Sequence, residues 1–582
     1  MNVRAFDVVL AVVCVASFAP GLTAPLTHYD DSTYLYQNTE HLDRPGLQGL
    51  LHQWDGSRAW NGDFIEFFPL RDSVYWAVYR HFQLEGWPYH VTSLLFHLAA
   101  TLLLLRFLRS LEVSDWVSRG VALLFAVHPI HIESVIWAAG LKDPMYTAFL
   151  FASLWAYAEY RKTPRPGLYA ASLIGLVLAL LVKSMAISLP LILIALERLV
   201  GTPTPWKVIA QRVFGFGAVA GLFFVQFILI GRANDAVTLP HGGSWATHAV
   251  LAIWVQAKYL KQALVPSTFR LIYCFEPAQG LADWRLWVGL AAIVWVVVLF
   301  WVWRRRPLLQ FGLAWYVACL LPVSNLVPFP ALMADRYLYA ALFGALLVVV
   351  SLLESFVRVR QFALAAIALA LGATTAARSA IWQDEEDLWR EPDEDPACMV
   401  DPAHWANDAH LLRAYTAKNE LDSLLAFERA LAAPSLPKSA HGCEILQVTA
   451  NAAARLNFQE RGAHFAALAA MNCPYEPQSW FVAMQTNVHR KPLVAAAAAE
   501  KMHRLRPTRL GELYVALTRL ELGLPESAEK VIALTQQSPE ATCTVVLEWV
   551  EQVAAHGPVL REAIERCVEV ARARGAPSPV GP

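Results

Sequence analysis

Two adjacent acids follow the first apolar stretch of the chain. Asp30 and Asp31 come directly after an apolar run that begins near residue 5. A well-placed carboxylate can accept the proton of a hydroxyl group while that hydroxyl attacks. Neighbouring side chains on a helix or strand point in different directions, so we expect the two acids to be unequal. We predict that one of them is the catalytic base, Asp30 before Asp31, and that the other supports it.

A histidine motif lies at the end of the third apolar stretch. The residues run His128-Pro129-Ile130-His131-Ile132-Glu133, with the histidines three positions apart. Two ring nitrogens and one acid fall short of the three or four ligands of a zinc site. We therefore assign no metal to His128, His131 and Glu133, although a divalent metal cofactor stays open, and expect the histidines to bind a phosphate or a sugar. The alternative is that they pack against neighbouring helices.

Further charges stand at the ends of apolar stretches, where ionisable groups are costly and often functional. They are Lys142-Asp143, Lys183 and Asp335-Arg336-Tyr337, and Arg71 lies in the long loop after the first stretch. An arginine fork suits phosphate oxygens, and a lysine acts as a point charge. We expect Arg336, Lys183 and Arg71 to bind a phosphate or sugar, with Glu133, Asp143, Asp335 and Tyr337 in support.

Membrane-spanning helices are needed to position these residues. Of the 582 residues, 56% are hydrophobic and only 16% are charged, which is typical of a membrane protein. The net charge of −1 excludes a nucleic-acid-binding chain, because phosphate backbones require a basic face. About eleven stretches have the ~20 apolar residues of a span. They are 5–24, 90–108, 117–137, 144–160, 168–182, 185–200, 208–230, 284–303, 308–326, 337–356 and 361–380.

Basic clusters follow alternate stretches, as in Arg106 and Arg109 or residues 304–306. The positive-inside rule places these clusters in the cytoplasm, with the amino terminus inside and the carboxyl terminus outside. Residues 25–88 then form a long outer loop. The amphipathic stretch 248–265 breaks the alternation, so we interpret it as an interfacial or re-entrant helix.

The chain changes character after Trp382, where eight acids lie between Asp384 and Asp395. Residues 383–582 are predicted to form a separate soluble domain of helix pairs, because their apolar residues recur at helical spacing. Degenerate tetratricopeptide repeats and a generic helical bundle both fit this pattern. Cys443 and Cys473 are one candidate disulfide, with buried free thiols as the alternative.

Several motifs together resemble the GT-C membrane glycosyltransferases, in particular the transmembrane and tetratricopeptide-repeat O-mannosyltransferases and the related protein O-mannosyltransferases. The matching segments are YDDSTYLYQN (29–38), FPLRDSVYW (68–76), YHVTSLLFH (89–97), ALLFAVHPIHIESVIWAAGLKD (122–143), VKSMAISLP (182–190) and PVSNLVPFPALMADRYLYA (322–340). The resemblance implies an all-α, GT-C-like catalytic domain over residues 1–382. It also implies that an acid of the first outer loop is the base, that Arg336, Lys183 and His128 lie on the donor side, and that the outer repeats bind the acceptor.

We therefore expect a hexosyltransferase that moves a monosaccharide, mannose by resemblance, from a polyprenyl-phosphate donor to a Ser or Thr hydroxyl of a protein, with inversion. The rivals are a GT-C enzyme that glycosylates a lipid or polysaccharide, and a non-catalytic transporter or assembly scaffold. A bacterial inner membrane with the carboxyl-terminal domain in the periplasm is the expected location.

Overall fold

The computed structural model describes residues 3–27, 29–57, 66–233, 240–328, 331–393, 413–432, 440–456, 458–473, 475–488, 490–524 and 526–552, with a few positions near 397 and 560–568. These residues are helical and contain no strand, which confirms the predicted all-α class. The chain divides into two compact units, Met1–Leu412 and Arg413–Pro582. The division lies beyond residue 382 because a further helix, α18, buries Trp389 in the core of the first unit.

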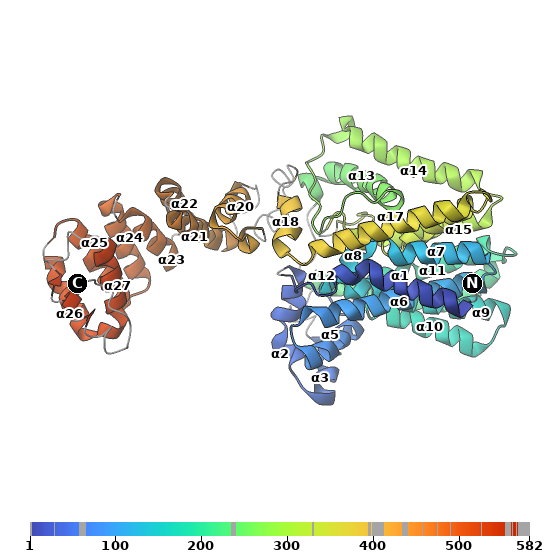
Figure 1. Cartoon of the computed structure of the whole chain (residues 1–582), viewed down its shortest axis with the longest axis horizontal. Helices are drawn as coiled ribbons and strands as arrows, with labels where there is room; N and C mark the ends of the chain where they lie inside the picture. The colour runs from blue at the N-terminus through green and yellow to red at the C-terminus, as the bar shows by residue number, and fades with distance from the viewer. Residues whose placement is uncertain are drawn as a thin grey trace. The chain divides into compact units, whose positions relative to one another are not determined.

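The helices of the first unit include all the predicted apolar stretches (Figure 1). They are α1 (Val3–Phe18), α2 (Thr39–Leu42), α3 (Gly46–His52), α5 (Pro69–Phe82), α6 (Gly86–Ser110), α7 (Asp115–Val127), α8 (Ile132–Ile136), α9 (Lys142–Lys162), α10 (Pro166–Leu180), α11 (Leu189–Leu199), α12 (Trp206–Ala233), α13 (Trp245–Leu264), α14 (Trp284–Val302), α15 (Pro307–Leu320), α16 (Leu342–Leu353), α17 (Arg360–Ile381) and α18 (Glu385–Asp393).

The number of spans differs from the prediction. Within the described residues, five helices are long and apolar enough to cross a membrane, or six if the bent pair α7–α8 is one span. The expected eleven is therefore not confirmed. Several apolar stretches form helices too short to span on their own, such as α10, α15 and α16. Proline also interrupts the third stretch, since Pro129 cannot donate to the helical ladder and the chain bends by 47° there.

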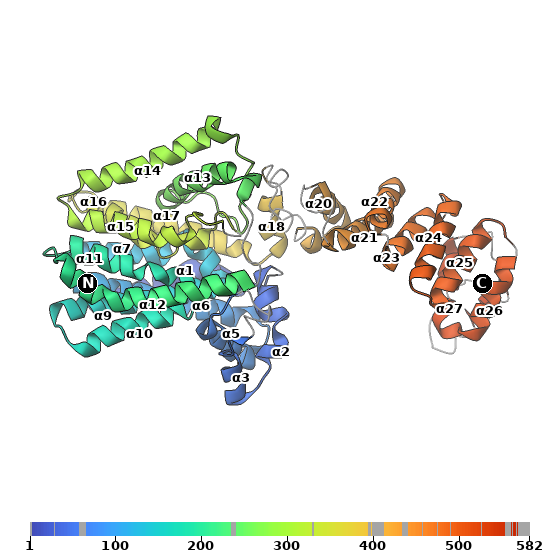
Figure 2. The same cartoon turned by 180° about the vertical axis from the view of Figure 1, so that it is seen from behind.

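The segment that carries the two acids lies at one end of the first unit. Helices α2, α3 and α5 gather at the end opposite the amino terminus, and α18 lies at that same end (Figures 1 and 2). The acids stand between the end of α1 and a π-helical turn, Ser32–Tyr36. Three short turns face this region from other parts of the chain: Pro129–His131, Ala138–Leu141 and Asp335–Leu338.

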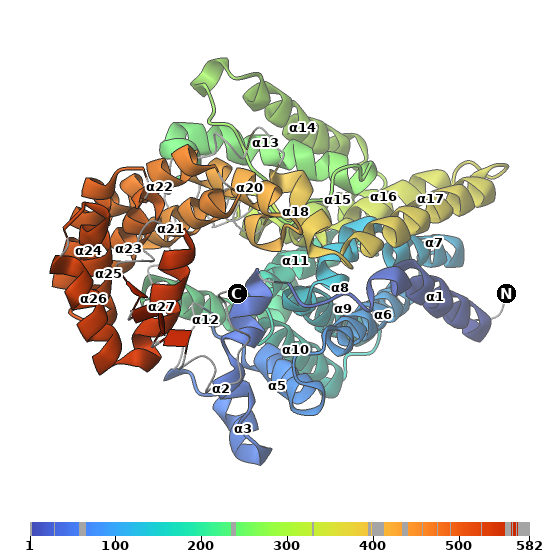
Figure 3. The same cartoon turned by 60° about the vertical axis from the view of Figure 1, so that its left-hand side comes forward.

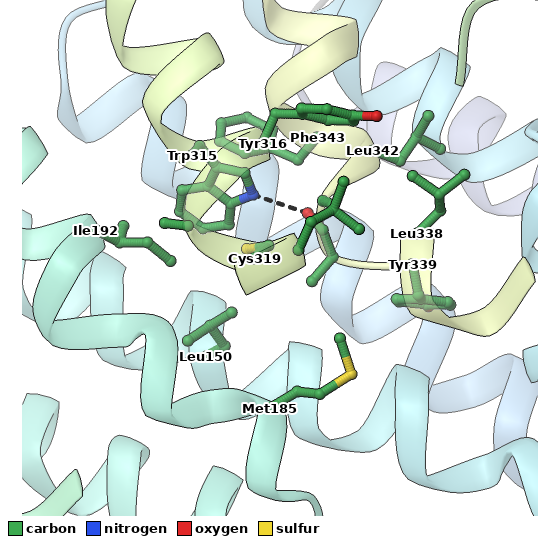
Figure 4. Close-up of a cluster of buried hydrophobic side chains, with 14 of the residues drawn as sticks. Leu150, Met185, Ile192, Trp315, Tyr316, Cys319, Leu338, Tyr339, Leu342 and Phe343 are labelled. Carbon is green, nitrogen blue, oxygen red and sulfur yellow. Dashed lines mark hydrogen bonds between the residues drawn. The ribbon is translucent and has the colours of Figure 1, made fainter. Parts of the chain in front are cut away.

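A core of aromatic and aliphatic side chains holds α9, α11, α15 and α16 together (Figure 4). Trp315 is fully buried, stacks on Phe151 at 5.6 Å and donates its indole N–H to the Ala340 carbonyl at 2.8 Å. Helices α15 and α16 cross closely, because a Cβ on Gly344 would lie 2.3 Å from the Gly312 carbonyl oxygen. Small residues allow such close crossings in membrane bundles. This packing fixes the turn at Asp335–Leu338, which directly precedes α16.

The second unit is a series of helices in which consecutive members pack on one another (Figure 3). They are α20 (Glu420–Ala432), α21 (Ala440–Arg455), α22 (Gln459–Asn472), α23 (Pro477–Asn487), α24 (Pro492–Leu505), α25 (Arg509–Glu521), α26 (Glu526–Gln537) and α27 (Pro539–Gln552). Two disulfides join parts of this unit, Cys443–Cys473 and Cys543–Cys567. The first is the candidate named from the sequence, and it is confirmed.

Candidate active site

Asp31 is a buried anchor for the start of the loop. Its side chain is fully buried, and one carboxylate oxygen accepts hydrogen bonds from the Thr27 backbone N–H at 2.9 Å and the Thr27 hydroxyl at 3.1 Å. The other oxygen accepts the Ala139 backbone N–H at 2.7 Å. Burial raises the pKa of Asp31 to about 7, although these donors favour the ionised form. Asp31 therefore ties the loop to the turn Ala138–Leu141.

Asp30 is placed differently. It is partly exposed, and within the described part of the chain its carboxylate has no hydrogen bond and no ion pair. Loss of hydration raises the pKa of Asp30, and the nearby positive charges of Lys142 and Arg336 oppose that rise. An open carboxylate with a raised pKa, facing two cations, has the properties of a general base beside an anion site.

Lys142 belongs to a network of charges from the first loop. Its ammonium lies 3.9 Å from the Glu66 carboxylate and 3.4 Å from the Tyr34 hydroxyl. Glu66 also accepts hydrogen bonds from Arg71 at 2.8 Å and Tyr34 at 3.1 Å. Burial alone would raise the pKa of Glu66, but the charges of Lys142 and Arg71 outweigh it and lower that pKa to about 2. Both distances to Lys142 are long, which leaves the ammonium donors available for a ligand.

Arg71 is fixed inside this network. Its guanidinium is fully buried, bonds Asp72 and Glu66 at 2.8 Å each, and lies 4.7 Å from the centre of the Tyr34 ring. Among the described residues, only its Nη2 atom lacks a partner. Two of its nitrogens hold Glu66 and Asp72. Binding of donor phosphate or sugar by Arg71 stays a prediction.

Arg336 is the second cation whose charge acts on Asp30. Glu133 accepts a hydrogen bond from the Arg336 backbone N–H at 2.9 Å and another from its guanidinium. The guanidinium also lies over the Trp137 ring, 5.2 Å from its centre. Glu133 uses both its oxygens to orient this one arginine, which fits the supporting role predicted for it.

Lys183 and Asp143 form a separate buried pair, 2.5 Å apart. Lys183 is also 5.8 Å from the ring centres of Tyr146 and Tyr337. Its charge is thus balanced by Asp143, whose second oxygen has no partner among the described residues. The lysine that faces Asp30 is instead Lys142, the residue just before Asp143.

The two histidines lie inside the bundle. His131 is fully buried against Phe125, Tyr339 and His97, with ring centres 4.2 to 4.9 Å away. His128 caps the turn that follows it by accepting the Ile130 backbone N–H at 3.2 Å. No group of three or more possible metal ligands occurs among the described residues. Both histidines thus pack inside the bundle, and their binding of a phosphate or sugar stays a prediction.

Two hollows flank the site. One is lined by Glu133, Arg270, Asp335 and Arg378 together with apolar side chains. Asp335 accepts a hydrogen bond from the Tyr273 hydroxyl at 2.8 Å. The other joins the first loop to α12. It is lined by Glu66, Phe67, Phe68, Leu180, Ser184, Phe223, Gln226, Phe227 and Ile230.

Some of these residues carried little sequence signal. Lys142 stood next to Asp143 at a span end, but nothing in the pattern distinguished the roles of the two. Glu66 and Tyr34 lie in a polar loop, where single acids and tyrosines are usually solvated. Only folding brings them to Lys142.

Comparisons with known proteins show a distant similarity to one group of enzymes. No family model matches the chain. The mouse protein O-mannosyl-transferase TMTC2 is 28% identical over 137 residues, which cover 23% of this chain and 16% of that protein. The human protein O-mannosyl-transferase TMTC4 is 23% identical over 452 residues, which cover 66% of this chain and 60% of that protein. The aligned segments thus span less than two thirds of these relatives. The chain has a distant similarity to the protein O-mannosyltransferases of the GT-C family, over part or most of its length.

Proposed function

We propose that this protein is a membrane glycosyltransferase that moves a hexose from a polyprenyl phosphate to a Ser or Thr hydroxyl of an acceptor protein. The proposed hexose is mannose. The observation that carries the proposal is the open Asp30 carboxylate, which faces Lys142 and Arg336 at the start of the first loop. The distant similarity to protein O-mannosyltransferases supports the same reaction class.

Asp30 acts as the general base. It takes the proton of the acceptor hydroxyl while the hydroxyl oxygen forms a bond to the anomeric carbon of the sugar. The bond from that carbon to the phosphate oxygen breaks, and the lipid phosphate leaves with the electron pair. Attack opposite the leaving group inverts the anomeric configuration. A positioned base contributes roughly 10²- to 10⁴-fold to the rate.

Lys142 and Arg336 bind the donor phosphate. Both face Asp30, and each keeps hydrogen-bond donors in excess of its acid partner. Charge-assisted bonds to phosphate strengthen as negative charge develops on the leaving group, which is the electrostatic contribution that usually dominates catalysis. Glu66 and Glu133 hold the two cations in place, so that neither must reorganise when the donor binds.

Other site residues have positioning roles in this proposal. Asp31 anchors the base loop through Thr27 and Ala139. Arg71 orients Glu66, and Asp143 neutralises Lys183 beside Tyr337. His128 and His131 stabilise the bend between α7 and α8 rather than bind the donor.

The hollow between the first loop and α12 is the proposed entry for the lipid. Its mostly apolar lining suits an isoprenoid chain, and Glu66, Ser184 and Gln226 are its polar members. Ligand sites commonly combine such an apolar lining with a few polar groups.

The pattern of basic residues supports an orientation with the first loop and the second unit outside the cytoplasm, in a bacterial inner membrane. Helix pairs like those of the second unit can bind an extended segment of an acceptor protein, and we assign that role to them by analogy with helical repeats.

The test uses the full-length protein purified in nanodiscs. Labelled polyprenyl-phosphate mannose is supplied with periplasmic protein or with lipid and polysaccharide acceptors, and the products are analysed for the label and its anomeric configuration. Labelled mannose on Ser or Thr, inverted relative to the donor, supports the proposal. Label found only on lipid or polysaccharide would overturn the proposal of a protein acceptor. The same assay is repeated with glucose and N-acetylhexosamine donors, and the absence of transfer from all three would overturn the proposal that the protein is an enzyme.

A further inference from the structure

A column of aromatic rings connects α18 with the loop that carries Asp30. Trp389 of α18 packs edge-on against Tyr29, with ring centres 5.5 Å apart. Tyr29 in turn stacks on Trp137, with ring centres 5.9 Å apart and planes 16° from parallel. Tyr29 is the residue directly before Asp30. The orientation of the Tyr29 ring therefore constrains the backbone that presents the candidate base.

The far end of this column touches the remaining groups of the site. The Trp137 indole N–H donates a hydrogen bond to the Thr27 hydroxyl at 3.1 Å, and that hydroxyl bonds Asp31. The Arg336 guanidinium lies over the same indole, 5.2 Å from the ring centre. Three rings thus join α18 to the base loop, to its anchor and to a phosphate-binding arginine.

α18 is itself held against the first span. Trp389 is fully buried, and its indole N–H donates to Glu385, one turn earlier, at 3.2 Å. At the corner between α17 and α18, the Gln383 amide donates to the Pro20 carbonyl at 2.7 Å and to the Thr23 hydroxyl at 2.9 Å. Trp389 thus fixes α18 to the base loop, and Gln383 fixes the corner before it to the segment that follows α1. The acids of α18 can serve to solvate the helix, but the fully buried Trp389 cannot.

We infer that Trp389 is a positioning residue, which acts through Tyr29 to hold the Asp30 carboxylate against the reacting hydroxyl. Its catalytic consequence rests on the proposed function. A loss of about 1 Å in alignment can cost up to roughly 100-fold in rate. Trp389→Leu keeps an apolar side chain in the core but removes the ring edge, and we expect a fall in kcat of about tenfold with an unchanged KM for the donor.

The kinetic test is a double-mutant cycle with Tyr29→Leu. If both residues act through the same column of rings, kcat of the double variant should be no lower than kcat of the slower single variant. If they act independently, the two decreases in kcat should multiply. Trp389→Phe keeps an aromatic edge and should retain most of the activity. Arg390→Ala is the matched control in the same helix, because the half-exposed Arg390 forms its ion pairs with Glu386 and Asp387 of α18 itself. Normal kcat in Trp389→Leu, or multiplied effects in the double variant, would overturn the inference.

A second readout does not depend on activity. Hydrogen exchange in the intact protein reports the Thr27 and Ala139 amides, which donate to Asp31. Both amides should exchange faster in Trp389→Leu and at the wild-type rate in Arg390→Ala, with α9 and α16 unchanged. Unchanged exchange at these two amides would refute the positioning role. If the proposed function itself is wrong, the result is different: the wild-type protein transfers no sugar.

Discussion

Replacement of Asp31 by Asn tests whether this acid is an anchor. Asp31 offers two acceptor oxygens to three donors, since the hydroxyl oxygen of the protonated acid keeps acceptor lone pairs, and Asn offers one oxygen and one N–H₂ group. If the Asn oxygen accepts from Thr27, the N–H₂ group faces the Ala139 backbone N–H, which then has no acceptor. If the side-chain amide is flipped, the N–H₂ group faces the Thr27 backbone N–H, which then has no acceptor. One buried backbone donor is left unpaired in either case, at a cost of about 1–3 kcal/mol.

The difference in stability between the wild type and Asp31→Asn depends on the pH. Burial raises the pKa of Asp31 to about 7 in the fold, compared with about 3.9 in an unfolded chain. The stability contributed by this protonated group is fully present below the unfolded pKa and is lost as the pH rises towards the folded pKa. Asn does not titrate. The advantage of the wild type is therefore largest near pH 4 and shrinks, by an amount on the order of 4 kcal/mol, up to about pH 7.

The assay is unfolding of the intact protein in a mild detergent, followed by tryptophan fluorescence at a series of pH values. Asp30→Asn is the control for the lost hydrogen bonds, since Asp30 has none to lose within the described residues, and its own raised pKa gives it a pH dependence of the same sign. Equal stability of Asp31→Asn and the wild type near pH 4, or a gap that widens as the pH rises, would refute the assignment of Asp31 as the anchor.

Three other outcomes follow from the geometry. The acid limb of the pH–rate profile should lie above the ordinary Asp value, because the pKa of Asp30 is raised and the base must be ionised; a limb centred below pH 4 contradicts this. Lys142→Ala should weaken donor binding about 10- to 100-fold, measured by titration with labelled lipid, since one charge-assisted contact is worth about 1.5–3 kcal/mol. Replacement of Cys443 and Cys473 by Ser opens a loop with a sequence separation of 30 and should destabilise the second unit by about 3–4 kcal/mol, with faster hydrogen exchange in α21 and α22. Unaltered exchange there would count against that estimate.

The sequence predicted the class of the fold but overestimated the number of spans. Hydropathy marks apolar stretches without showing where a helix ends. Pro129 and Pro190 divide two of these stretches into short helices, which a window of apolar residues does not register. Ala- and Leu-rich helices after residue 413 were recognisable from their spacing, but the packing of α18 with the first unit was not. That depends on Trp389, one aromatic residue in an acidic run.

The candidate site was predicted in part. The inequality of Asp30 and Asp31 followed from their adjacency, and the structure adds which one is buried. The pairing of Glu133 with Arg336 joins residues 203 positions apart, and no local pattern indicates it. Local spacing also made His128 and His131 look like a ligand pair. Their burial against Phe125 and Tyr339 is a property of the bundle, which the spacing does not contain.

The central claim is that Asp30 is the base of a glycosyl transfer, and single-turnover transfer by Asp30→Asn tests it most directly. With the donor saturating, the rate should fall by roughly 10²- to 10⁴-fold relative to the wild type, while the Kd for the donor stays within about threefold. Asp30→Asn that transfers sugar at a rate within tenfold of the wild type would contradict the claim.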